Sequence, residues 1–126
     1  MLGSAKAVAF IQVRDQARAR AFYEGVLGLP VTVDPHALIA RVGDCRLRIT
    51  ALPDWTPSPH PAFPFEVGDL APVIAALKRH GTAFVRYDFL GDAQDAEGVW
   101  TGPDGARVAW FHDPDGNLLM LSTHVG

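Results

Sequence analysis

Sulfur, positive charge and long apolar runs are scarce in this sequence, and each scarcity excludes a class of protein. Of the 126 residues one is a cysteine, Cys45, so no disulfide bond can form within the chain. Because Cys45 flanks an apolar run, it is predicted to be a small buried core residue rather than a reactive thiol. Acidic residues outnumber lysine and arginine by 14 to 11, and the net charge of −3 gives no reason to expect binding to nucleic acid or to an anionic membrane.

Apolar residues are plentiful, but they do not gather in one long segment. No run approaches the length of a membrane-spanning helix, and residues 1–4 lack the charged and long apolar regions of a secretory signal, so a cytoplasmic protein is expected. Hydrophobic residues make up 48% and charged residues 20%, which is an ordinary globular composition. A chain of 126 residues can bury one sizeable core, and we predict a single domain over residues 1–126.

One pattern occurs twice in the chain, with an offset of 54 residues. VAFIQVRD at 8–15 aligns with AFPFEVGD at 62–69, so that Asp15 and Asp69 each follow a strand-like run. Aspartate at this place is a common N-cap, and both positions are predicted to begin a helix.

Apolar residues at helical spacing follow each aspartate. The first stripe ends at Gly28 and the second at Gly81, as expected where a helix stops. Phe22 and Tyr23 are expected to anchor the first helix on its sheet. The stripes consist of Ala19, Phe22, Tyr23, Val26 and Leu27, and of Leu70, Val73, Ile74 and Leu77.

Short strand-like runs separated by turn residues fill the rest of the chain. The predicted strands cover 6–13, 30–34, 37–42 and 45–52 in the first half, and 61–67, 82–87, 98–102, 106–112 and 117–123 in the second. This order predicts an α+β fold: two tandem βαβββ modules that form a curved mixed sheet around a cup-shaped cavity, with pseudo-repeats at about 6–52 and 61–123. A ferredoxin-like domain would have fewer strands.

Three segments carry a resemblance to a known family. They are AFYEGVLGLPV at 21–31, FEVGDLAPVIAALKRHG at 65–81 and WFHDPDGNLLMLS at 110–122. In this order and spacing the chain resembles the vicinal-oxygen-chelate superfamily, which includes glyoxalase I, bleomycin-resistance proteins and extradiol dioxygenases. The DPDG turn and the aromatic pair specify the fold and say little about chemistry.

The resemblance also implies where a divalent metal would bind. In this superfamily its ligands are histidine or glutamate near the start of each half's first strand, and glutamate near the end of each half. These positions fall on Val8, Ala62, Arg48 and Met120. Zn²⁺, Ni²⁺, Fe²⁺ and Mg²⁺ prefer imidazole, carboxylate or thiolate ligands, so we predict no metal and no cofactor.

Histidines elsewhere do not form a ligand pattern such as H-x-H or H-x-x-x-H. His60 would enter the cup if the strand register slipped by two residues, and His112 leads into the DPDG turn. Both stay open as members of a displaced metal site. The remaining histidines are His36, His80 and His124.

The predicted cup is mainly apolar with a few polar groups, because alternate residues of a strand share one face. Arg48 would grip a ligand carboxylate or stack on an aromatic ring, or else form a structural ion pair with Glu66. Tyr87 and Phe89 precede a loop at 88–98 that is either a lid over the cup or a solvated connection. The candidate ligand-binding residues are Val8, Phe10, Gln12, Arg48, Ala62, Glu66, Trp100, Trp110, His112 and Met120.

These features favour a metal-independent protein that sequesters a hydrophobic or aromatic small molecule, similar to the bleomycin-resistance branch. The resemblance implies a homodimer. One alternative is an enzyme, a lyase, isomerase or dioxygenase, either with displaced metal ligands or with Glu66 as a base and Arg48 stabilising an anion. Another is a structural or regulatory module whose cup is filled by its own core.

Overall fold

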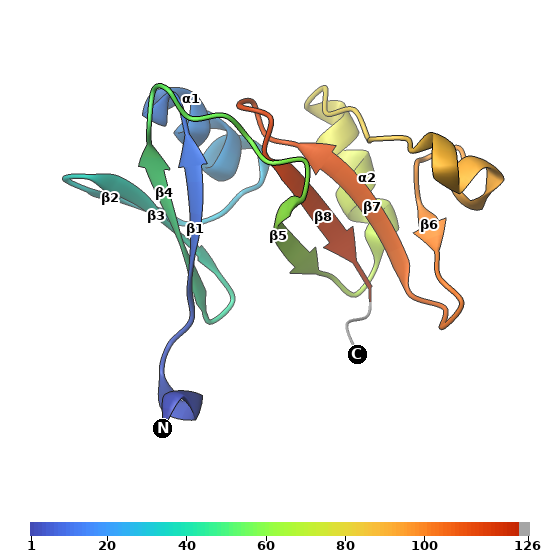
Figure 1. Ribbon diagram of the computed structural model, residues 1–126, viewed down its shortest axis with the longest axis horizontal. Helices are drawn as coiled ribbons and strands as arrows, with labels where there is room; N and C mark the ends of the chain where they lie inside the picture. Colours follow the sequence, from blue (N-terminus) through green and yellow to red (C-terminus); the bar gives the residue numbers. More distant parts are fainter. Residues whose placement is uncertain (124–126) are drawn as a thin grey trace. The chain divides into compact units, whose positions relative to one another are not determined.

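The computed structural model describes residues 1–123 and divides into two compact units. The first unit is Met1–Pro57 and the second is Ser58–Gly126. The boundary lies in the proline-rich segment 53–61, between the two copies of the sequence repeat. Each unit has its own four-stranded sheet (Figure 1).

The first unit has strand, helix and three more strands in chain order, blue to green in Figure 1. Its sheet has the order β1-β4-β3-β2, in which β1 is parallel to β4 and the other neighbours are antiparallel. The elements are a short 3-10 helix η1 (Leu2–Ser4), β1 (Val8–Val13), α1 (Gln16–Arg20), a π-helical segment η2 (Ala21–Val26), β2 (Val31–Asp34), β3 (Ala37–Val42) and β4 (Cys45–Ala51).

The second unit repeats this topology. Its sheet has the order β5-β8-β7-β6, with β5 parallel to β8 and the other pairs antiparallel. The elements are β5 (Pro61–Glu66), α2 (Leu70–Arg79), a kinked 3-10 helix η3 (Asp88–Ala93), β6 (Trp100–Thr101), β7 (Arg107–His112) and β8 (Leu118–Ser122). The α+β class and the two tandem βαβββ modules are thus confirmed.

Both aspartates cap helices as predicted. The Asp15 carboxylate accepts a hydrogen bond from the Arg18 backbone N–H at 3.1 Å, and the Asp69 carboxylate accepts one from Ala71 N–H at 3.2 Å. Gly28 after the first helix has a φ of 71°. This left-handed conformation favours glycine and allows the chain to leave the helix there.

The aromatic pair anchors the first helix, also as predicted. Tyr23 is fully buried and Phe22 is 7% exposed, with their rings edge to face. The helix widens into the π-helical segment over Ala21–Val26, where Leu27 N–H reaches back to the Phe22 carbonyl. The 3.6-residue periodicity could not distinguish this widening from an ordinary α-helix.

The DPDG turn is held by its first aspartate. Asp113 Oδ1 accepts hydrogen bonds from the N–H groups of Asp115 and Asn117, both at 2.9 Å. The Asn117 side-chain amide donates to the other Asp113 oxygen at 2.7 Å. All three residues are buried, so this polar motif is structural and joins β7 to β8.

Two sequence predictions are wrong. Residues 82–87 do not form a strand; they make a single bridge between Phe84 and Phe111, because the Gln94 side chain takes backbone groups of Val85 and Tyr87. Cys45 is half-buried rather than part of the core, since it begins β4 beside the hairpin turn.

Alternation along the strands separates a core face from an outer face in each sheet. In the first unit the core face carries Ile11, Val13, Leu38, Leu47 and Ile49, all at most 1% exposed. In the second unit the corresponding residues are Ala109, Phe111, Leu119 and Leu121, and the buried residues of α2 are Leu70, Ile74 and Leu77. The candidate ligand-binding residues occupy the other faces.

We predict that Asp15→Ala and Asp69→Ala each lower the free energy of unfolding by about 1 kcal/mol, because a helix N–H loses its acceptor. Urea denaturation measures the change. Asp54→Ala is the matched control: Asp54 is exposed and has no side-chain hydrogen bond within residues 1–123. An equal loss of stability in the control would contradict the capping role.

Candidate functional site

The outer face of the first sheet brings four of the candidate residues together. In the parallel pair β1–β4, Val8 lies beside Arg46, Phe10 beside Arg48 and Gln12 beside Thr50. Phe10 is 59% exposed and Val8 is 44% exposed, which is high for apolar residues in a sheet. This face therefore presents apolar side chains next to guanidinium groups.

Arg48 has an ionic partner within its own unit, Asp34. The Arg48 guanidinium donates to the Asp34 carboxylate at 3.4 Å, and each side chain remains about one-third exposed (32% and 36%). A pair this open to solvent contributes little to stability, on the order of 0–1 kcal/mol. Asp34, at the end of β2, is a neighbour that strand alternation along β4 alone does not reveal.

The outer face of the second sheet carries the other candidates. Met120 lies between Pro64 and Trp110, and Ser122 lies between Glu66 and Val108. Ala62 is exposed and falls at an irregularity of β5, where the register shifts between Pro61 and Phe63. Trp100 pairs with Val108, two residues from Trp110, and His112 is exposed opposite Leu118.

The registers show that Arg48 and Met120 occupy equivalent positions in the two halves. Phe10 and Pro64 are 54 residues apart, the offset of the sequence repeat, and they pair with Arg48 and Met120. The registers therefore align β4 of the first unit with β8 of the second at these two residues.

Four aromatic rings form a continuous cluster beside Met120. Tyr87 contacts Phe89 at a centroid distance of 5.3 Å and Trp110 at 5.2 Å, and Trp110 lies 6.5 Å from Trp100. Phe89 at the end of the cluster is 82% exposed. Burial raises the pKa of the Tyr87 hydroxyl above its ordinary value, because the surroundings of the ring disfavour the charged phenolate.

Gln94 organises the loop at 88–98, and no pattern in the sequence predicts this role. Its amide nitrogen donates to the Val85 and Gly98 carbonyls at 3.0 and 2.9 Å, while its oxygen accepts from Tyr87 N–H at 2.7 Å. Gln94 is 4% exposed. These hydrogen bonds hold the loop in one conformation and position Tyr87. The loop also contains the helix η3, which the sequence pattern does not predict.

The residues at the family's metal positions do not fit a divalent ion. Val8 and Ala62 have no donor atom, Arg48 is cationic, and Met120 offers a thioether, which is a poor ligand for Zn²⁺, Fe²⁺ or Mg²⁺. Within residues 1–123 no group of three histidine, cysteine, aspartate or glutamate side chains has the geometry to hold a metal.

The histidines are scattered through the described chain. His36 follows the end of β2, His60 lies in the connector, and His80 ends α2. His112 is the last residue of β7, and His124 lies outside the described residues.

Membrane-spanning helices are not found among residues 1–123. No helix in this range is both long enough and apolar enough to cross a membrane.

Comparison with known proteins identifies the family to which this fold belongs. The family model of the Glyoxalase/Bleomycin resistance protein/Dioxygenase superfamily matches residues 6–121. The chain belongs to this superfamily. No curated protein matches it.

Solved structures of this superfamily share the fold at low sequence identity. A glyoxalase family protein from Enterococcus faecalis has a TM-score of 0.76 at 20% identity, over 97% of this chain and 99% of the other. A superfamily member from Sphaerobacter thermophilus has a TM-score of 0.75 at 20% identity, covering 98% and 100%. A lactoylglutathione lyase from Agrobacterium tumefaciens has a TM-score of 0.73 at 18% identity, covering 98% and 96%.

We predict that Gln94→Ala lowers the free energy of unfolding by about 2–3 kcal/mol, because it leaves buried backbone groups without partners. Amide hydrogen exchange should accelerate over residues 85–99. Asp92→Ala, in the same loop but exposed, is the matched control and should change neither quantity. Unchanged exchange in Gln94→Ala would show that the loop does not depend on this side chain.

Proposed function

We propose that this superfamily member binds a hydrophobic or aromatic small molecule without the help of a metal. The observation that carries the proposal is the aromatic cluster of Tyr87, Phe89, Trp100 and Trp110 beside Met120. Ring faces and edges at 5–7 Å spacing suit the stacking of a further aromatic ring. A methionine next to them adapts its shape to different apolar ligands.

Metal independence is proposed from the chemistry of the side chains. At the four positions where the family holds its metal, this chain has Val8, Arg48, Ala62 and Met120, and their side chains do not suit a divalent cation. The strand registers support this proposal at two of the four positions, because Arg48 and Met120 pair with residues that are 54 positions apart, Phe10 and Pro64.

A buried polar group lies on the same strand face as Met120. The Ser122 hydroxyl is buried and has no hydrogen-bond partner among residues 1–123. It lies two residues from Met120 on the same strand face. Leaving a buried hydroxyl unpaired costs about 1–3 kcal/mol, and a ligand would offset this cost only if movement of neighbouring side chains opened the face to it.

Turnover of a substrate is the alternative, because the similar structures include a lactoylglutathione lyase. At 18% identity this neighbour is evidence for a shared fold, and it does not show that this chain catalyses the same reaction. We also propose that the protein is a homodimer, because the family resemblance implies one. Light scattering of the purified protein would measure its oligomeric state.

We predict that the neutral aromatic probe N-phenyl-1-naphthylamine binds the protein and that Phe89→Ala weakens its affinity about three- to tenfold, through loss of ring contact. Fluorescence titration measures the affinity. Phe89 is 82% exposed, so its replacement should leave the fold intact. Trp55→Ala, in the connector, is the control and should bind normally; equal weakening in both variants would refute the role of the cluster.

We predict that protein purified without chelator contains far less than one divalent metal ion per chain. Its affinity for the probe should be the same before and after treatment with EDTA, because no side chain at the family's metal positions is a suitable ligand. Elemental analysis and fluorescence titration provide the two readouts. Stoichiometric metal whose removal abolishes probe binding would overturn metal independence and favour the enzyme.

A further inference from the structure

Two arginines lie directly opposite each other on β3 and β4. Arg41 and Arg46 are Cα partners in the antiparallel pair. Arg41 N–H donates to the Pro30 carbonyl and Arg46 N–H donates to the Ala7 carbonyl, so both backbone donors are turned away from the β3–β4 ladder. The pair is therefore of the non-hydrogen-bonded kind, in which the Cα atoms approach more closely and the side chains begin close together.

Like charges placed directly opposite on a sheet repel each other unless a counter-charge lies between them. Neither guanidinium has an ionic or hydrogen-bonding partner within residues 1–123. Arg48, two residues along β4, is different because Asp34 neutralises it. The fold thus supplies a counter-ion for one arginine of this face and leaves two facing arginines without one.

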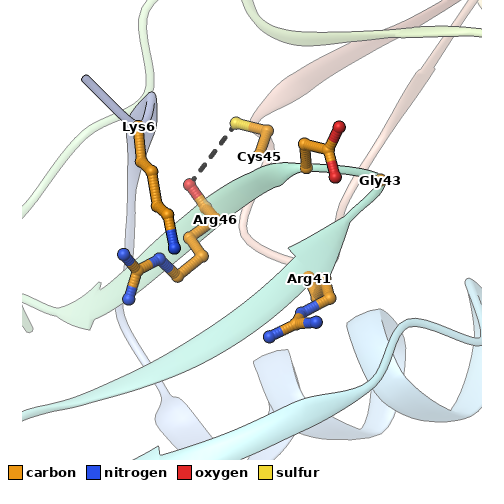
Figure 2. Close-up of a pocket in the computed structure, with 6 residues that line it drawn as sticks. Lys6, Arg41, Gly43, Cys45 and Arg46 are labelled. Atoms are coloured by element: carbon orange, nitrogen blue, oxygen red, sulfur yellow. Dashed lines mark hydrogen bonds between the residues drawn. The ribbon is translucent and has the colours of Figure 1, made fainter. Parts of the chain in front are cut away.

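A third cation completes the arrangement. Lys6, just before β1, lines a cavity of about 400 Å³ together with Arg41 and Arg46. Figure 2 shows that the three side chains come from three separate segments of the first unit. Asp44 is the one carboxylate that lines this cavity, so its formal charge is +2.

A second cavity of about 540 Å³ shares both arginines. Its other lining residues are Pro30, Thr32 and Ile39, which are mainly apolar. A ligand whose charged group lies between the two guanidiniums can therefore rest an apolar part on Pro30 and Ile39. Arginine suits such recognition because its planar fork binds the oxygens of phosphate-like groups in pairs.

We propose that Lys6, Arg41 and Arg46 form a binding site for the dianionic oxyanion of a small organic phosphate or sulfate. A dianion matches the formal charge of the cavity and removes the repulsion across β3–β4. The site lies wholly in the first unit and does not depend on the proposed binding of neutral aromatic molecules by the second.

The charge of the first unit favours the approach of such a ligand. Residues 1–57 contain seven lysine and arginine residues against five acidic ones, whereas residues 58–126 contain four against nine. Arginine and lysine keep their charge across the physiological pH range. The whole chain therefore has a net negative charge, while its first unit has a net positive one.

Phenyl phosphate, inorganic phosphate and acetate at equal ionic strength test the proposal by thermal unfolding. We expect both phosphates to raise the unfolding temperature more than acetate does, and phenyl phosphate to act at lower concentration. The shift should vanish in the double variant Arg41→Gln with Arg46→Gln. The double variant Arg18→Gln with Arg20→Gln removes the same charge from helix α1 and should keep the full shift.

Alkylation of Cys45 by iodoacetamide locates the site, because this single cysteine lines the cavity. Bound phenyl phosphate should slow the reaction at least about threefold in the wild type and not in the arginine double variant.

Two results of the thermal experiment would overturn the proposal. One is a shift in unfolding temperature that survives in the arginine double variant, and the other is a shift with phosphate no larger than that with acetate. Equal potency of the two phosphates would overturn the role of the apolar cavity. Normal binding of N-phenyl-1-naphthylamine alongside either result would leave the proposed function intact.

Discussion

Parallel pairing of the first and last strands closes each unit, and the rest of the structure depends on it. The pairs β1–β4 and β5–β8 join segments that are separated by a helix and two strands. Their registers decide which residues face the core and which face outward. A slip of one residue would turn Ile49 out of the core and Arg48 into it, so burial of the aliphatic face fixes the register strongly. The chemistry of the outer faces follows from that constraint.

The outer faces differ between the units although their backbones correspond. Phe10 beside Arg48 in the first sheet corresponds to Pro64 beside Met120 in the second. One face carries exposed arginines, and the other adjoins a cluster of aromatic rings. The two units thus share the apolar character of their core faces and differ in the chemistry of their outward positions. Membership of the superfamily accounts for the shared backbone, and the side chains on the outer faces give each unit its own chemistry.

Much of the fold could be predicted from the sequence because its signals are local. Asp15 and Asp69 each precede an apolar stripe of helical period, and each caps its helix. The site was predictable only in part, since strand alternation places Val8, Phe10 and Arg48 on one face but does not identify their partners. The Arg48–Asp34 pair joins residues 14 positions apart across three strands, and no local pattern reveals it. The role of Gln94 could not be predicted for a similar reason. Its side chain bonds the Val85 and Gly98 carbonyls, but in the sequence it looks like any polar loop residue.

The parallel closure of each unit also sets an order of events during synthesis. A parallel pair cannot form until the whole crossover between its strands exists, and such distant contacts form slowly. All strands of the first sheet have been made once Ala51 is added, whereas β5 must wait for β8 near the far end of the described chain. On the ribosome the cationic unit therefore has its complete set of strands while the exposed edge of β5 is still without its partner. The nascent second half, with its apolar strand β8 still to come, is the part of the chain that remains open to wrong pairing for longest.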